Sequence, residues 1–161
     1  MAELLGEVAT EALDRFPGRE VELDVSRKLV WPIDRTKVAL VLRHLLANAL
    51  EYSSDPEPVT VRARELEKED LLVVEVQDRG EGILSTDIPH VFERFRQVDS
   101  SSTREHGGIG VGLYLCSQLV KLHQGRIWAD SSWGKGSTFS FSLPHPQSGR
   151  NVVRLKSSGG A

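Results

Sequence analysis

The chain has 161 residues, of which 39% are hydrophobic and 27% charged, and this fits one domain with a core of its own. Its 20 Lys and Arg residues against 23 Asp and Glu give a net charge of -3, so the charge balance argues against nucleic acid as a main partner. The single cysteine excludes an internal disulfide, and no apolar run approaches the length of a membrane span.

The N-terminal part of the chain predicts a helix followed by a strand. Residues 2–16 place apolar side chains on one face of an amphipathic helix, which a Pro-Gly pair ends. Val21, Leu23 and Val25 then alternate with charged residues, a pattern typical of a half-buried strand.

A long second helix and two strands follow. Asp34 is suited to cap the helix, whose apolar positions continue to about Tyr52. Two prolines then break the chain. The composition of Val59–Ala63 and Leu71–Val76 predicts two antiparallel strands joined by a charged turn.

Residues 77–112 differ from the rest in being rich in glycine. They contain one short apolar helix candidate, Ile88–Phe95, and the polar stretch Gln97–Gly107, which has no periodicity. A long stretch of this kind in a compact domain is typical of a lid or a binding loop.

The C-terminal part predicts a third helix and a last pair of strands. Gly112–His123 has the apolar positions of a helix, with Cys116 among them as a core residue, and Gly125 is expected to stop it. Ile127–Ala129 and Phe139–Leu143 have the pattern of strands.

This order of elements predicts an α+β fold. We expect a two-layer α/β sandwich, with a mixed, mostly antiparallel sheet and about three helices on one face. The domain is expected to span residues 1–144, and the polar segment 145–161 to be a disordered tail or linker.

A polar stripe interrupts the second helix. Asn48 lies four residues after His44 and four before Tyr52, so the three side chains share one face. An amide oxygen suits Mg²⁺, and a histidine near the metal could orient or deprotonate a water or hydroxyl. Taken alone, the pattern is more typical of a polar stripe with satisfied hydrogen bonds.

The run Asp78–Ile83 comes straight after a predicted strand. Its glycines permit a tight turn, and Asp78 can accept a hydrogen bond from an exocyclic amino group such as that of adenine. Taken alone, Asp and Gly in this pattern are more typical of a surface turn.

Two further glycine runs flank the third helix. Gly107–Leu113 opens it, and glycines that expose backbone N–H groups at a helix start can cradle phosphate. The spacing is neither that of a Rossmann fold nor that of a P-loop, and a flexible hinge fits the run equally well. Gly134–Phe139, between two strands, is by itself an ordinary hairpin turn.

Taken in order, these motifs resemble the catalytic, ATP-binding domain (HATPase, GHKL-type) of sensor histidine kinases. The wider family includes Hsp90-type chaperones, type II topoisomerases and MutL-type repair ATPases. The resemblance runs from about Leu4 to Pro144. It rests on an asparagine box, a first glycine box, a phenylalanine box that favours the kinases, a second glycine box and a last turn: His44–Ser53, Asp78–Ile83, Phe92–Phe95, Gly108–Leu113 and Gly134–Phe139.

The resemblance implies a Bergerat-type ATP-binding fold that uses ATP and Mg²⁺. Asn48 would hold Mg²⁺, and His44 beside it would be a candidate catalytic residue. Asp78 would take the adenine amino group, and Tyr52 would lie beside the nucleotide. The base pocket would be completed by Gly80, Gly82, Ile83 and Thr138.

The resemblance also implies a phosphate end of the site. Gly108, Gly110 and Gly112 would wrap the phosphates, with Leu113 following them. Arg96 resembles a phosphate-contacting lid arginine, and the polar stretch after it would be the mobile ATP lid.

Three positions depart from the family's pattern. His44 stands where many such kinases have asparagine and the related ATPases glutamate. Glu51 stands where lysine or arginine is frequent, which removes a positive charge near the phosphates. Val111 replaces a usual leucine.

The resemblance implies two protein partners, the histidine-bearing dimerisation domain of a parent kinase and a downstream response regulator. None of the five histidines lies in an acceptor motif ahead of the catalytic domain, so the acceptor is expected to come from another domain. The isolated domain is expected to be monomeric and cytoplasmic, with a parent that can be membrane-anchored. A serine kinase of the anti-sigma type, a stand-alone ATPase of this fold and a nucleotide-binding interaction module remain alternatives.

Overall fold

The computed structural model describes residues 1–53, 56–94 and 111–146. In chain order its elements are α1 (Ala2–Arg15), β1 (Val21–Val25), α2 (Arg35–Tyr52), β2 (Val59–Leu66), β3 (Leu71–Gln77), the 3₁₀ helix η1 (Ile88–His90), α3 (Gly112–Leu122), β4 (Arg126–Ser132) and β5 (Gly136–Pro144). None of the helices in these ranges is both long and apolar enough to cross a membrane.

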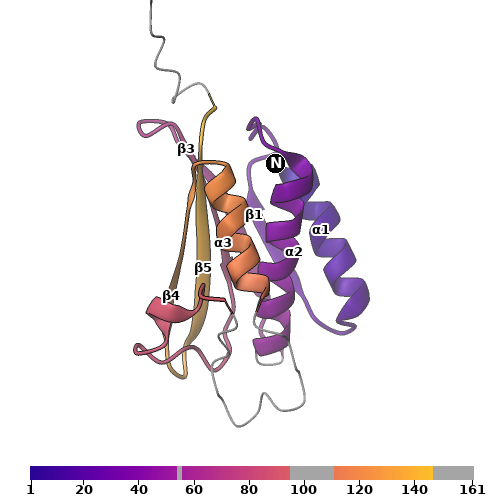
Figure 1. Cartoon of the computed structure of the whole chain (residues 1–161). Helices are drawn as coiled ribbons and strands as arrows, with labels where there is room; N and C mark the ends of the chain where they lie inside the picture. The colour runs from indigo at the N-terminus through magenta and orange to yellow at the C-terminus, as the bar shows by residue number, and fades with distance from the viewer. Residues whose placement is uncertain (54–55, 95–110, 147–161) are drawn as a thin grey trace, which may run out of the picture.

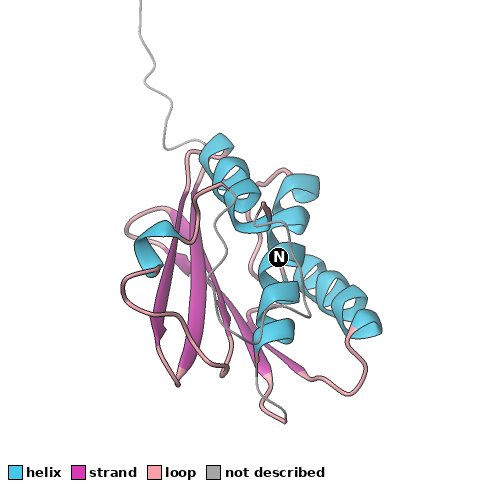
Figure 2. Ribbon diagram, turned by 60° about the horizontal axis from the view of Figure 1, so that its bottom comes forward, coloured by secondary structure: helices cyan, strands magenta, loops and turns pink. Residues whose placement is uncertain are grey.

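The strands form one mixed sheet in the order β1-β2-β3-β5-β4. β1 pairs with β2 in parallel, and the other three pairings are antiparallel. The three α-helices lie on one face of this sheet (Figures 1 and 2). The predicted α+β, two-layer architecture is therefore confirmed.

The core lies between the helices and the sheet because every element turns an apolar face toward that layer. From β3, Leu72, Val74 and Val76 are at most 1% exposed, and Phe141 of β5 is fully buried. Alternate residues of a strand point to opposite faces, so Glu75 and Gln77 of β3 and Ser140 and Ser142 of β5 lie on the outer face. Cys116 is buried in this core, as expected.

A local sequence signal explains where α2 begins. Asp34 caps α2, because its carboxylate accepts a hydrogen bond from the backbone N–H of Lys37 at 3.1 Å.

Helices α2 and α3 run antiparallel. His44 of α2 contacts Gly112 at the start of α3, whereas His123 at the end of α3 lies with Asp34 around a hollow at the start of α2.

One expectation about helix content was wrong. The half-buried strand expected from Val21 to Val25 is confirmed as β1, in which Val21 and Val25 pack against the core and Leu23 is 39% exposed. The helix expected over Ile88–Phe95 is only the short η1. Pro89 stands in the first turn, where an N–H has no partner within a helix, so the proline does not account for the early end of η1. Phe95 lies outside the described residues.

Gly125 has a different role from the one expected. α3 ends at Leu122, and Gln124 takes the left-handed conformation, with φ of 57°. A Cβ on Gly125 would overlap the carbonyl oxygen of Ser142 on β5. Glycine here permits the close approach of the chain to the sheet.

The predicted tail, residues 145–161, lies outside the described residues from residue 147 onward. His145 is described, and its ring packs edge-on against Trp31 at a centroid distance of 5.2 Å.

Candidate nucleotide-binding site

Asp78 is the buried acidic residue at the end of β3, and only 4% of it is exposed. Its Oδ1 accepts hydrogen bonds from the backbone N–H groups of Gly80 at 2.9 Å and Ser137 at 3.1 Å. Burial raises the pKa of Asp78, and the two hydrogen bonds act in the opposite direction. No described residue donates to Oδ2, so this oxygen is available to a ligand.

The turn after Asp78 is pressed against the end of α2. Gly80 is buried and forms an isolated antiparallel bridge with Ser53, the residue that ends α2. A Cβ on Gly80 would overlap the carbonyl oxygen of Tyr52. Only glycine allows the Asp78 turn to come this close to the helix.

The same turn is pressed against the β4–β5 hairpin on its other side. Gly82 has φ of +73°, and its Cβ would overlap the carbonyl oxygen of Ser132. Gly136 has φ of +93°, and its Cβ would overlap the carbonyl oxygen of Asp78. The first glycine box and the last turn, distant in sequence, thus build one surface.

Ser131 fastens these two segments together. Its Oγ accepts a hydrogen bond from the N–H of Ile83 at 2.8 Å and donates to the carbonyl of Gly136 at 2.9 Å. Thr138 lies half-buried further along β5, where its backbone pairs with Gln77, the residue before Asp78. The structure therefore brings together the residues predicted for the adenine end.

The polar stripe of α2 extends from His44, which lies beside Gly112, to Tyr52, whose backbone lies beside Gly80. His44 and Asn48 are half-buried, and Tyr52 is 47% exposed at the end of the helix. Partial burial lowers the pKa of His44 below its usual value, so the imidazole is mainly neutral at pH 7. Burial, with the charge of Glu51, raises the pKa of Tyr52.

The start of α3 packs against this stripe. A Cβ on Gly112 would lie 3.2 Å from Nδ1 of His44, so the helix terminus comes within contact of the imidazole. Among the described residues no side chain caps the first turn of α3, and the start of a helix carries the positive end of its dipole. Leu113 is half-buried and packs against the core.

Several predicted site residues lie outside the described residues. They are Arg96, Gly108 and Gly110, together with the expected lid Gln97–Gly107. Of the phenylalanine box, Phe92 is described and packs edge-on against Phe139 of β5, with ring centroids 6.2 Å apart.

The described residues contain no group of three or more His, Cys, Asp or Glu side chains that could hold a metal ion. The polar groups of the α2 stripe are the imidazole of His44, the amide of Asn48 and the phenol of Tyr52. This donor set does not fit a metal held by protein alone, but it fits Mg²⁺, which takes one or two protein oxygens and completes its shell with phosphate and water.

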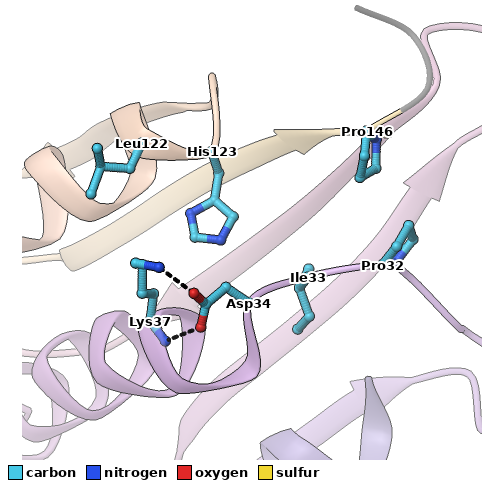
Figure 3. A pocket seen from close by; sticks show the side chains of 7 residues that line it. All are labelled: Pro32, Ile33, Asp34, Lys37, Leu122, His123 and Pro146. Carbon is cyan, nitrogen blue, oxygen red and sulfur yellow. Dashed lines mark hydrogen bonds and ion pairs between the residues drawn. The ribbon is translucent and has the colours of Figure 1, made fainter.

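A separate hollow of about 450 Å³ lies at the opposite end of α2 and α3 (Figure 3). Its charged residues are already paired, because Lys37 donates to Asp34, and its apolar wall includes Leu122, which is 70% exposed. None of the predicted site residues lines it.

Sequence reasoning missed the contributions of Ser131 and Ser137. Both are small hydroxyl residues in strands, and strand periodicity gives them no distinguishing signal. The hydrogen bond of Ser137 to Asp78 comes from its backbone, which any residue could provide. A partial signal was the Gly134–Phe139 run, which already marked this hairpin.

Comparison with known proteins agrees with this geometry. Residues 33–147 match the family of histidine kinase-, DNA gyrase B- and HSP90-like ATPases. The sensor histidine kinase WalK of Bacillus subtilis is 38% identical over 145 residues, which cover 90% of this chain and 22% of WalK. The chain therefore spans about a fifth of the length of this relative.

Two solved structures are similar throughout the domain. The mycobacterial sensor histidine kinase MprB has a TM-score of 0.79 and 26% identity, over 90% of this chain and 95% of that one. Full-length ShkA, in complex with AMPPNP, has a TM-score of 0.78 and 25% identity, over 89% of this chain and 29% of ShkA. The chain therefore belongs to the family of histidine kinase-, DNA gyrase B- and HSP90-like ATPases, and within it to the branch of the sensor histidine kinases.

Proposed function

We propose that the chain is the Mg·ATP-binding catalytic domain of a two-component sensor histidine kinase. It presents the γ-phosphate of ATP to a histidine on a separate dimerisation domain, for relay to a response regulator. The observation that carries the proposal is Asp78, whose Oδ1 is held by two backbone N–H groups while Oδ2 has no donor among the described residues. The AMPPNP complex of ShkA and the identity with WalK support it.

The adenine end is assigned to the surface around Asp78. The carboxylate accepts from the exocyclic amino group, since an ionised acceptor with one oxygen already fixed by the backbone is oriented before the ligand arrives. Gly80 and Gly82 let the turn pack against α2 and against the β4–β5 hairpin, and together with Ile83 and Thr138 they are proposed to form the wall of the base pocket. Tyr52 lies at the edge, where its exposed ring can flank the nucleotide.

The phosphate end is assigned to α2 and the start of α3. Backbone N–H groups at Gly112 and Leu113 point from a helix N-terminus, which favours an anion. Gly108, Gly110 and Arg96 are proposed to complete this end. We propose that Asn48 binds Mg²⁺, which would neutralise charge on the phosphates. His44, neutral and beside Gly112, is a candidate to orient the reacting groups.

We assign the catalytic domain to residues 1–144. We propose that it acts in the cytoplasm, where ATP is available. Phosphoryl transfer needs mainly positioning and charge neutralisation, and an acceptor nitrogen held near the γ-phosphate. The relatives in which such a domain occurs are several times longer than this chain, so the acceptor histidine is expected on a further part of the parent kinase.

The test of this function is phosphoryl transfer between separate proteins. The chain alone, given γ-labelled ATP, is expected to take up no stable phosphate. Mixed with the helical domain of its own parent, it is expected to label that domain's histidine, at a reduced rate because the two parts are not tethered. The label should be labile in acid and stable in base. Acid-stable label on an added protein would favour a serine kinase, and ATP binding without transfer an interaction module.

Asn48 provides a separate test of the metal. Asn48→Ala removes the proposed oxygen ligand, so the ratio of ATP-analogue affinities with and without Mg²⁺ is expected to fall to about one, while the fold stays intact. Isothermal titration calorimetry measures the ratio. Gln118→Ala, which removes a half-buried amide from α3, is the matched control and should keep the wild-type ratio. A persistent Mg²⁺ effect in Asn48→Ala would contradict the assignment.

A further inference from the structure

The segment between α1 and β1 reaches the nucleotide site through one side chain. Arg19 lies in this segment, and its Nη1 donates a hydrogen bond to the backbone carbonyl of Ser53 at 3.0 Å. The two residues are 34 positions apart in sequence. Nη2 of the same guanidinium is shielded from solvent. Arg19 is therefore packed into the fold at this point and does not extend into water.

Ser53 ends α2, and the end of a helix favours a positive charge. The last carbonyl groups of a helix lack partners within the helix and carry the negative end of its dipole. α2 has no basic residue of its own in its last turn. Arg19 supplies the cation from elsewhere in the chain and at the same time occupies the carbonyl oxygen of Ser53.

Ser53 is also the residue that holds the Asp78 turn. It is 7% exposed and forms the isolated bridge to Gly80. The N–H of Gly80 in turn donates to Oδ1 of Asp78 at 2.9 Å. A continuous set of contacts therefore runs from Arg19 through Ser53 and Gly80 to the proposed adenine acceptor.

An ion pair also restrains the Asp78 turn. Nη1 of Arg79 lies 2.7 Å from Oε2 of Glu57, and both side chains are largely exposed. Exposed ion pairs contribute little to stability because water screens them. The partly buried contact of Arg19 with Ser53 is therefore the stronger of the two restraints on the Asp78 turn.

We propose that Arg19 is a positioning residue for the adenine end of the nucleotide site. It holds the C-terminal end of α2 in place through Ser53. The Asp78 turn, which is bridged to Ser53, is thereby held in the orientation that directs the carboxylate of Asp78 toward the ligand. The measurement of nucleotide affinity rests on the proposed function. The measurement of hydrogen exchange at Gly80 needs no ligand.

The experiment compares Arg19→Ala with Arg19→Lys and with Arg43→Ala. Arg43 also ties α2 to the N-terminal part of the chain, through Glu11, but on the solvent side and away from the turn. Arg19→Ala is expected to weaken binding of a non-hydrolysable ATP analogue by at least about threefold, because the hydrogen bond to Ser53 is lost. Arg19→Lys, which keeps a cationic donor, is expected to fall between Arg19→Ala and wild type. Arg43→Ala should bind as wild type does.

Two further readouts separate positioning from stability. Arg19→Ala should lower the preference for an ATP analogue over the matching GTP analogue, because the displaced carboxylate no longer meets the adenine amino group. In ligand-free protein, the amide N–H of Gly80 should exchange with deuterium faster than in wild type. A lower melting temperature with unchanged affinity, selectivity and Gly80 exchange would overturn the proposal.

The outcomes also distinguish this proposal from the proposed function. If the wild-type chain bound no nucleotide, the proposed function would fail, and the exchange rate of Gly80 would still decide whether Arg19 fixes the turn. If Arg19→Ala did not fold, the same exchange and selectivity measurements on Arg19→Lys would decide it. In either case, exchange at Gly80 equal to that of the Arg43→Ala control would reject the role of Arg19.

Discussion

Replacing Asp78 with asparagine is expected to weaken binding of a non-hydrolysable ATP analogue by about 10- to 150-fold, and to leave the fold at least as stable. The amide oxygen can still accept from the N–H groups of Gly80 and Ser137. The amide nitrogen then takes the place of Oδ2, where it opposes the amino group of adenine with a second donor. Calorimetry gives the affinity, and urea unfolding the stability.

The pH dependence of stability and of ATP affinity provides a further test of the buried carboxyl of Asp78. Burial raises the pKa of this carboxyl in the folded protein above its unfolded value. Its contribution to stability is therefore fully present below the unfolded pKa and is lost as the pH rises through the folded pKa. Asparagine has no charge to bury, so the stability of Asp78→Asn relative to wild type should increase from acid to neutral pH. ATP affinity of wild type should fall on acidification, at a higher pH than an exposed aspartate would give.

Asp130→Asn is the matched control, because Asp130 is exposed on β4. It should bind the analogue within about twofold of wild type, a change worth less than half a kcal/mol. Equal affinity of Asp78→Asn and wild type, with both proteins folded, would remove Asp78 from the site.

Gly82→Ala should destabilise the domain far more than Gly134→Ala, although both glycines have nearly the same φ angle. Their φ angles are +73° and +76°. A left-handed backbone costs a non-glycine residue about 1–2 kcal/mol, and this applies to both variants. The Cβ of Gly82→Ala also overlaps the Ser132 carbonyl, whereas that of Gly134→Ala meets open space. Overpacking adds about 1–3 kcal/mol to Gly82→Ala alone.

The same pair tests whether the turn forms the base pocket. Relief of the overlap in Gly82→Ala requires the turn to move away from the hairpin, so ATP-analogue affinity should fall by about tenfold or more. Gly134→Ala should retain wild-type affinity. Urea unfolding and calorimetry measure both quantities. Equal losses of stability in the two variants would show that backbone strain, and not contact with Ser132, decides the effect.

The sequence by itself determined most of the local structure and the chemical class of the site. Helix periodicity and the Asp34 cap gave α2 its correct bounds, because a cap and an apolar stripe act within a few residues. The position of Asp78 directly after β3 followed from strand alternation, which also acts locally. The order of the glycine runs then indicated the family, since each run needs only its own residues to be recognised.

The tertiary structure alone decided how these segments meet. The hydrogen bond from Ser137 to Asp78 joins residues 59 positions apart, and that from Arg19 to Ser53 joins residues 34 apart. Such contacts depend on strand order and register, which no local pattern encodes. The overlap that requires glycine at Gly125 likewise comes from Ser142 on a different element. Local propensity determines which element a residue belongs to. The orientation of a side chain such as Asp78 is set by backbone groups that the fold brings from elsewhere in the chain.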